Sequence, residues 1–196
     1  MKALIIVDIQ NDFLEGGSLA VPNGNEIIPI VNSIQQNYDL IVATQDWHPP
    51  NHKSFAIEHE EKKEYEIINL NGLQQVLWPV HCVQGTFGAE FHKDLDVRKI
   101  EGIFRKGMNP EIDSYSGFFD NGKRKNTGLF GYLKDREVTE VTVVGLAADF
   151  CVYFTAKDAL ELGFKTTVLE NATKPINAEG WQRTILDLQY RGGIIQ

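Results

Sequence analysis

The stretch VTVVGLAADFCVYF, residues 141–154, decides the fold that we expect for this chain. It begins as an apolar strand, breaks at Gly145, and turns into a helix predicted over residues 151–162. A cysteine at such a turn lies where free backbone N–H groups and the positive end of the helix dipole converge. This setting lowers a thiol pKa and can stabilise an oxyanion. We therefore interpret Cys151 as a reactive nucleophile, with a buried structural cysteine as the alternative.

Apolar segments typical of strands alternate with segments of helical periodicity along the whole chain. The run ALIIVDI, residues 3–9, is typical of a strand buried on both faces of a parallel sheet. The alternation predicts a three-layer α/β/α fold with a mostly parallel, six-stranded sheet. No linker divides the chain, so we expect a single domain over residues 1–196. The other expected strands are 39–44, 102–106, 140–146, 165–169 and 193–196; the expected helices are 24–37, 127–136, 151–162 and 177–190, and residues 64–78 are ambiguous.

The net charge limits the binding partners that we expect for this chain, and the cysteine content indicates its cellular compartment. The formal net charge of -8 argues against a nucleic-acid surface or an anionic membrane as partner. Cys82 and Cys151 are the only cysteines, which excludes a disulfide framework and suits a reducing cytosol. The apolar run near the N-terminus is too short for a signal peptide or a membrane span. We expect a cytoplasmic protein that acts on a small molecule.

Four chemically active side chains follow four of the predicted strands. Asp8 lies at the end of the first strand, Asp46 just past the second, Lys106 at the end of the third and Cys151 just past the fourth. Ligands of open α/β sheets bind at the carboxyl ends of the strands. We therefore expect these residues to meet at one edge of the sheet despite their separation in sequence.

Asp8, Lys106 and Cys151 form a plausible set for nucleophilic catalysis. A cysteine that attacks an amide needs a group to accept its proton and to return it to the leaving nitrogen. A partly buried carboxylate, whose pKa burial raises, can do both. A lysine beside them would stabilise the thiolate. The alternatives are a turn role for Asp8 and a surface ion pair for Lys106.

A second group of side chains has the composition of a metal site. Asp46 and His48 are two residues apart, so their side chains point the same way in an extended segment. His81 would come from a distant loop. A carboxylate and two imidazoles with open positions suit Zn, Fe(II) or Mn. His52 is either a further ligand or a neighbour of the site. Cys82, beside His81, is interpreted as a buried structural thiol, with a metal ligand as the alternative.

Several aromatic residues lie on loops near the same edge of the predicted sheet. Together they could sandwich a flat ring. Ordinary core packing is the alternative for each of them. They are Phe13, Trp47, Trp78, Tyr115 and Phe119.

The motifs that contain these residues resemble those of the nicotinamidases in the isochorismatase-like hydrolase superfamily. The resemblance runs in order from about residue 3 to residue 170. It implies the isochorismatase-like fold, a catalytic triad of Asp8, Lys106 and Cys151, and the metal ligands Asp46, His48 and His81. The motifs are VDIQNDF (7–13), QDWHPPNH (45–52), WPVHCVQGTFGAEFH (78–92), RKG (105–107), DSYSGF (113–118) and GLAADFCVYFTA (145–156).

The resemblance also implies details of the turn before the nucleophile. It implies a cis peptide bond between Leu146 and Ala147, and an oxyanion hole formed by the backbone N–H groups of Ala147 and Cys151. Position 148, often threonine in relatives, is alanine here. Ala148 removes a side-chain hydroxyl but leaves the backbone donors unchanged.

The activity that the resemblance implies is metal-assisted hydrolysis of nicotinamide to nicotinate and ammonia in NAD salvage. Phe13, Trp78 and Tyr115 would flank the substrate ring, and pyrazinamide would also be accepted. One divalent metal is implied, with Zn as the first choice and Fe or Mn as alternatives. A homo-oligomer remains open. The alternative functions are another amidase or a vinyl-ether hydrolase of the same superfamily, and a catalytically silent relative that binds a ligand.

Overall fold

The structure is a computed structural model that describes residues 1–196. Its centre is a six-stranded sheet in the order β5-β2-β1-β6-β7-β8, and every neighbouring pair is parallel. The predicted mostly parallel, six-stranded sheet is therefore confirmed. The strands are β1 (Lys2–Val7), β2 (Leu40–Asp46), β5 (Gly102–Lys106), β6 (Glu140–Leu146), β7 (Lys165–Lys174) and β8 (Ile194–Ile195).

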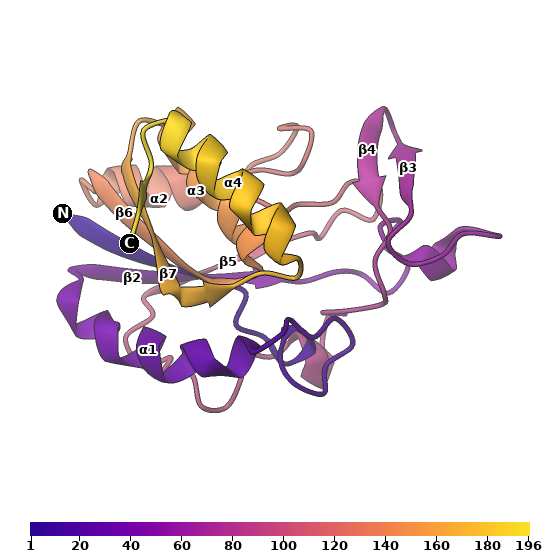
Figure 1. Ribbon diagram of the computed structural model, residues 1–196, viewed down its shortest axis with the longest axis horizontal. Coiled ribbons are helices and arrows are strands. Elements are labelled where there is room, and N and C mark those ends of the chain that lie inside the picture. Colours follow the sequence, from indigo (N-terminus) through magenta and orange to yellow (C-terminus); the bar gives the residue numbers. More distant parts are fainter.

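Helices cover both faces of this sheet and make the three layers (Figure 1). Helix α1 (Ile27–Ile34) lies on one face, whereas α2 (Leu129–Asp135), α3 (Tyr153–Glu161) and α4 (Ala178–Tyr190) lie on the other. No helix has the length and the apolar composition that crossing a membrane requires. The shorter helical turns are Asn11–Phe13, Gly24–Glu26, Gln35–Asn37, Ala56–Glu58, Phe87–Ala89 and a π-helical turn at Ala148–Val152.

Two expectations about the segments after the strands were wrong. The helix predicted to begin at residue 151 begins at Tyr153, and Cys151 lies within the π-helical turn that precedes it. Strand β7 continues to Lys174, five residues beyond the end of the apolar run that predicted it. Its pairing with β6 shifts register between Val143 and Gly145, so the polar second half still pairs with the end of β6.

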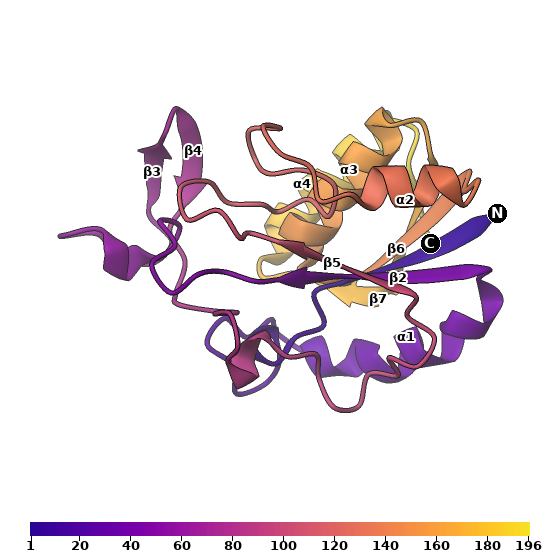
Figure 2. The same cartoon turned by 180° about the vertical axis from the view of Figure 1, so that it is seen from behind.

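The ambiguous segment 64–78 contains an antiparallel hairpin, β3 (Ile67–Leu70) and β4 (Leu73–Val76). Asn71 and Gly72 join the strands, and both have positive φ angles of 52° and 89°. Asn-Gly is the preferred pair for such a two-residue turn, so this dipeptide was a signal for the hairpin. The hairpin projects beyond the carboxyl ends of β2 and β5 (Figure 2).

Gly145 is required because β6 passes very close to β1. Its φ angle is 115°, and a Cβ atom there would lie 2.1 Å from the carbonyl oxygen of Val7. No L side chain fits that contact. The glycine therefore lets the end of β6 approach the strand that precedes Asp8.

We expect Leu4→Ala in β1 to lower the free energy of unfolding by roughly 2–5 kcal/mol, because the lost side chain would leave a cavity between the layers. Leu4 is fully buried, in the middle of the central strand. Urea denaturation followed by circular dichroism would measure the change. Leu186→Ala, on an exposed position of α4, is the control and should change stability by about 0.5 kcal/mol or less. Equal effects of the two substitutions would contradict the expectation.

Candidate active site

The side chains of Asp8, Asp46, Lys106 and Cys151 meet at the carboxyl end of the sheet. The ammonium nitrogen of Lys106 lies 2.9 Å from Asp8 Oδ2, 3.0 Å from Asp46 Oδ1 and 3.4 Å from Cys151 Sγ. It also donates to the Ser114 carbonyl at 2.9 Å. The four side chains are all buried. The expected convergence is therefore present, with Lys106 at its centre.

Strand register explains why these distant residues meet. Asp46 and Lys106 are direct partners across the β2–β5 pair. Val7, which precedes Asp8, pairs with Thr44 on one side and with Gly145 on the other. Parallel strands thus bring their ends, and the residues that follow them, to one edge.

Burial and neighbouring charge control the ionisation of the Lys106–Asp46 pair. Burial opposes both charges, but each is stabilised by its neighbours. The carboxylates of Asp46 and Asp8 raise the pKa of Lys106 well above its usual value. His48 and Lys106 hold the pKa of Asp46 well below its usual value, again against burial. Lys106 is therefore a fixed positive charge.

Asp8 has the properties expected of a proton acceptor. Burial raises its pKa, and the positive charge of Lys106 only partly offsets that effect. The hydroxyl of Thr44 donates a hydrogen bond of 2.7 Å to Oδ1. This bond orients the carboxylate so that Oδ2 faces Lys106.

The expectation of a lowered pKa for the Cys151 thiol was wrong. Burial raises this pKa well above its usual value, and the neighbouring Lys106 charge compensates only in part. The prediction considered the helix end and not the loss of solvent, which disfavours a thiolate. A buried thiol of this kind needs a base when it attacks, and Asp8 lies beside the same ammonium group.

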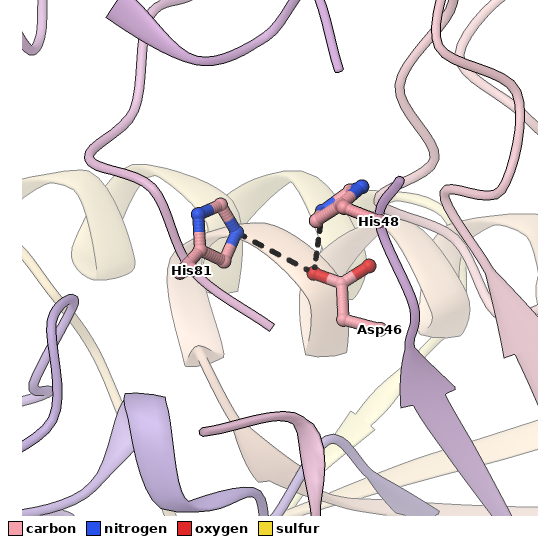
Figure 3. A group of neighbouring side chains, drawn as sticks. All are labelled: Asp46, His48 and His81. Atoms are coloured by element: carbon pink, nitrogen blue, oxygen red, sulfur yellow. Dashed lines mark ion pairs between the residues drawn. The ribbon is translucent and has the colours of Figure 1, made fainter. Parts of the chain in front are cut away.

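Asp46, His48 and His81 surround one point, as Figure 3 shows. Oδ2 of Asp46 lies 3.3 Å from His48 Nε2 and 3.7 Å from His81 Nε2. The Nδ1 atoms of the two rings lie 2.9 Å from the Gly107 carbonyl and 2.8 Å from the Pro79 carbonyl. Because a carbonyl only accepts, Nδ1 carries a hydrogen in both rings, and in the neutral form of each ring Nε2 has the lone pair that a metal ion needs.

These three residues fit a divalent metal ion. Two imidazole lone pairs and a carboxylate oxygen converge on one buried point, and His48 Nε2 has no hydrogen-bond partner in the protein. Although burial disfavours a charged ring, Asp46 raises the pKa of His48, so the point favours positive charge. One carboxylate and two imidazoles match the ligands of zinc and related ions.

His52 differs from the other two histidines in its hydrogen bonds. Its Nδ1 accepts from the Ser54 backbone N–H at 3.1 Å and lies 2.7 Å from the Ser54 hydroxyl. Burial lowers the pKa of His52 to about 4. The neutral ring therefore carries its hydrogen on Nε2, so that nitrogen is a donor and has no lone pair for a metal. His52 borders His48, and its hydrogen bonds favour a neighbour of the site over a third imidazole ligand.

A cavity with aromatic walls opens beside Cys151. The four residues expected to contact a substrate all line it: Phe13, Trp78, Tyr115 and Ala147. Trp47 and Phe119 do not, and Trp47 instead packs under the Arg105 guanidinium at 3.9 Å. The peptide bond between Leu146 and Ala147 is cis, as the resemblance implied.

Four further residues of the cavity were missed by the sequence reasoning. Phe150 packs edge-on against Trp78 with ring centroids 4.9 Å apart. Asp113 stands in the motif DSYSGF, but it lies on a long loop where neither strand ends nor periodicity mark it. The four are Leu19, Asp113, Phe150 and Ile176.

The chain belongs to the isochorismatase family. The family model described as the isochorismatase domain matches residues 2–196. The resemblance seen in the motifs is thereby confirmed.

Individual relatives are nicotinamidases. The chain is 46% identical over 182 residues to the nicotinamidase of Escherichia coli, which covers 91% of this chain and 85% of that protein. It is also similar to a solved nicotinamidase/pyrazinamidase structure from Acinetobacter baumanii, with 47% identity, a TM-score of 0.96 and coverage of 99% and 94%. A pyrazinamidase from Pyrococcus horikoshii, solved in complex with zinc, is 39% identical with a TM-score of 0.81 and coverage of 100% and 98%.

Proposed function

We propose that the protein is a nicotinamidase, which hydrolyses nicotinamide to nicotinate and ammonia and also accepts pyrazinamide. The observation that carries this proposal is the contact of one buried ammonium group with Asp8, Asp46 and Cys151 at the wall of an aromatic cavity. The high identity to nicotinamidases over most of the chain supports it. A cytoplasmic role in NAD salvage belongs to the same proposal.

Substrate binding uses the aromatic walls and the metal site. Phe13, Trp78 and Tyr115 flank the pyridine ring. A divalent ion held by Asp46, His48 and His81, zinc before iron or manganese, would supply a Lewis acid that anchors the ring nitrogen. The aromatic walls hold the ring with its carboxamide near Cys151, and such positioning can lower the activation barrier by several kcal/mol.

Acylation follows from the positions of Cys151 and Asp8. Asp8 takes the thiol proton as the sulfur attacks the carboxamide carbon, and a C–S bond forms. The N–H groups of Ala147 and Cys151 hold the oxyanion, where one lost donor typically costs about 3 kcal/mol. The C–N bond then breaks, and the proton on Asp8 leaves with ammonia. Lys106 stays charged throughout and stabilises whichever of Asp8 and Cys151 is anionic.

Deacylation repeats the proton transfers with water in place of the thiol. Asp8 takes a proton from water, whose oxygen attacks the thioester carbon. The C–S bond breaks, nicotinate leaves, and the thiol recovers its proton from Asp8. The same carboxylate thus acts as base and acid in both halves of the reaction.

We expect removal of the metal by a chelator to lower kcat/KM for nicotinamide by at least about 100-fold, because the ring loses its anchor. Ammonia release, measured with glutamate dehydrogenase, follows the activity, and elemental analysis verifies the metal content. Adding Zn²⁺ back should restore the rate. Full activity of a verified metal-free protein would contradict the metal's role. The absence of ammonia release from the metal-loaded protein would contradict the proposed function itself.

A further inference from the structure

Asp113 is a buried carboxylate whose protein partners are neutral. Only 3% of the residue is exposed. Its Oδ1 accepts from the Ser114 backbone N–H at 2.7 Å, and its Oδ2 accepts from Gln75 Nε2 at 3.0 Å. Burying a carboxylate is costly unless a positive charge compensates it. A cation near Asp113 would therefore offset the cost of burying its carboxylate.

The charges around the site agree with that requirement. Asp8, Asp46 and Asp113 contribute three buried carboxylates, and Lys106 contributes one buried ammonium. Two negative charges remain without compensation. A divalent ion at the metal site would neutralise the pair, and without Asp113 the same ion would leave an excess of positive charge.

Asp113 lies next to a proposed metal ligand, not in a separate site. An oxygen of Asp113 and ring nitrogens of His48 and His52 all lie within 4.8 Å of one another. His48 also belongs to the group with Asp46 and His81, whose ligand atoms meet the same limit. The two groups therefore share His48, and a charge on Asp113 acts at short range on an ion held there.

His52 contributes a hydrogen-bond donor on the same side. The Ser54 backbone N–H occupies its Nδ1, so its Nε2 carries a hydrogen. The residue is fully buried, and its Nε2 makes no hydrogen bond of good geometry in the protein, although the Ile112 carbonyl lies nearby. A donor on His52 and an acceptor on Asp113 thus border His48 together.

We propose that Asp113 and His52 are outer partners of the metal ion: neither binds it directly, and together they hold a water molecule that ligates it. Asp113 accepts a hydrogen bond from that water and supplies the charge that retains the ion. His52 donates a hydrogen bond to the same water, and Gln75 fixes the Asp113 carboxylate. Both are positioning residues. This inference rests on the metal site of the proposed function.

The test measures metal binding without substrate. Metal-free wild-type protein and the Asp113→Asn variant are titrated with Zn²⁺ against a chromophoric chelator, and with Co²⁺ to record the d–d absorption bands. Asparagine keeps the shape and one of the two acceptor oxygens but removes the charge. Outer partners of this kind typically contribute 10–100-fold to metal affinity, and we expect a loss in that range with unchanged Co²⁺ bands. Glu111→Gln, which removes an exposed charge two residues away, is the matched control and should bind as wild type.

Two results would overturn the inference. Wild-type affinity in Asp113→Asn, in protein with a native circular dichroism spectrum, would show that Asp113 does not act on the ion. A lost or shifted Co²⁺ band would show instead that Asp113 is a direct ligand. Failure of the wild-type protein itself to bind either ion would contradict the metal site of the proposed function, which is a distinguishable outcome.

His52→Gln and His52→Phe test the donor. We expect both to retain the Co²⁺ bands and His52→Phe to weaken binding, whereas glutamine, which keeps an N–H donor, should weaken it less. The carbonyl of Ile112 lies beside the His52 ring and is the competing partner. If the ring only bonded that carbonyl, His52→Phe would lower thermal stability and leave metal affinity unchanged, and the role of His52 would be rejected.

Discussion

Replacing Cys151 with alanine is expected to lower the rate of ammonia release from nicotinamide by at least about 10⁴-fold, because the nucleophile is lost. The substitution removes a single sulfur that contacts Lys106 at 3.4 Å. It leaves Asp46, His48 and His81 unchanged, so the protein should keep its metal. A coupled ammonia assay and elemental analysis of the same sample would measure both quantities.

The chain offers a matched control in its other cysteine. Cys82 is fully buried, and its sulfur lies 3.9 Å from the Gly88 carbonyl, with no contact to Lys106. Burial raises its thiol pKa well above the usual value, which is typical of an unreactive structural cysteine. Cys82→Ala should therefore retain most of the activity. Near-normal turnover by the Cys151→Ala variant would reject the nucleophile.

Lys106→Met is expected to lower the free energy of unfolding by roughly 3–5 kcal/mol, because it leaves Asp8 and Asp46 buried without their shared counter-ion. The variant should also lose most of its activity, since no charge would stabilise the anion on Asp8 or Cys151. Urea denaturation of the metal-free proteins at pH 7 would measure the stability change.

Lys123→Met is the control for Lys106→Met, because it removes a lysine whose ion pairs are partly exposed to solvent. Lys123 pairs with Asp158 at 3.0 Å and also with Glu161, but about half of its side chain is exposed. Exposed ion pairs contribute up to about 1 kcal/mol. If Lys106→Met were no more destabilising than Lys123→Met, the central ammonium would not be the electrostatic support that its contacts indicate.

Sequence patterns were sufficient where an apolar or β-branched run marks a strand of the parallel sheet. The strands predicted at 102–106 and 140–146 have these bounds in the structure. The start of the helix after Cys151 was not predictable from periodicity, since a π-helical turn has nearly the same composition as an α-helical one. The hairpin around Asn71 and Gly72 was missed because its strands are short and only partly buried.

The candidate site was predictable to the extent that strand ends mark it. Asp8, Asp46 and Lys106 follow or end apolar runs, so their convergence follows from a parallel sheet. The prediction of a lowered pKa for the Cys151 thiol was wrong, because the sequence shows the end of the helix but not the loss of solvent around the sulfur. Asp113 could not be assigned, since its place depends on a loop path and on Gln75, 38 residues earlier.

The β3–β4 hairpin contacts the walls of the cavity beside Cys151 through the side chain of Gln75. Its side-chain amide reaches Asp113 at 3.0 Å and the Tyr115 hydroxyl at 3.1 Å, and Trp78 Nε1 donates to the same hydroxyl at 3.2 Å. Insertions or deletions near Asn71 would therefore tilt an aromatic wall without disturbing the sheet. Changes in the hairpin would therefore alter the selectivity among heterocyclic amides and leave the catalytic residues unchanged.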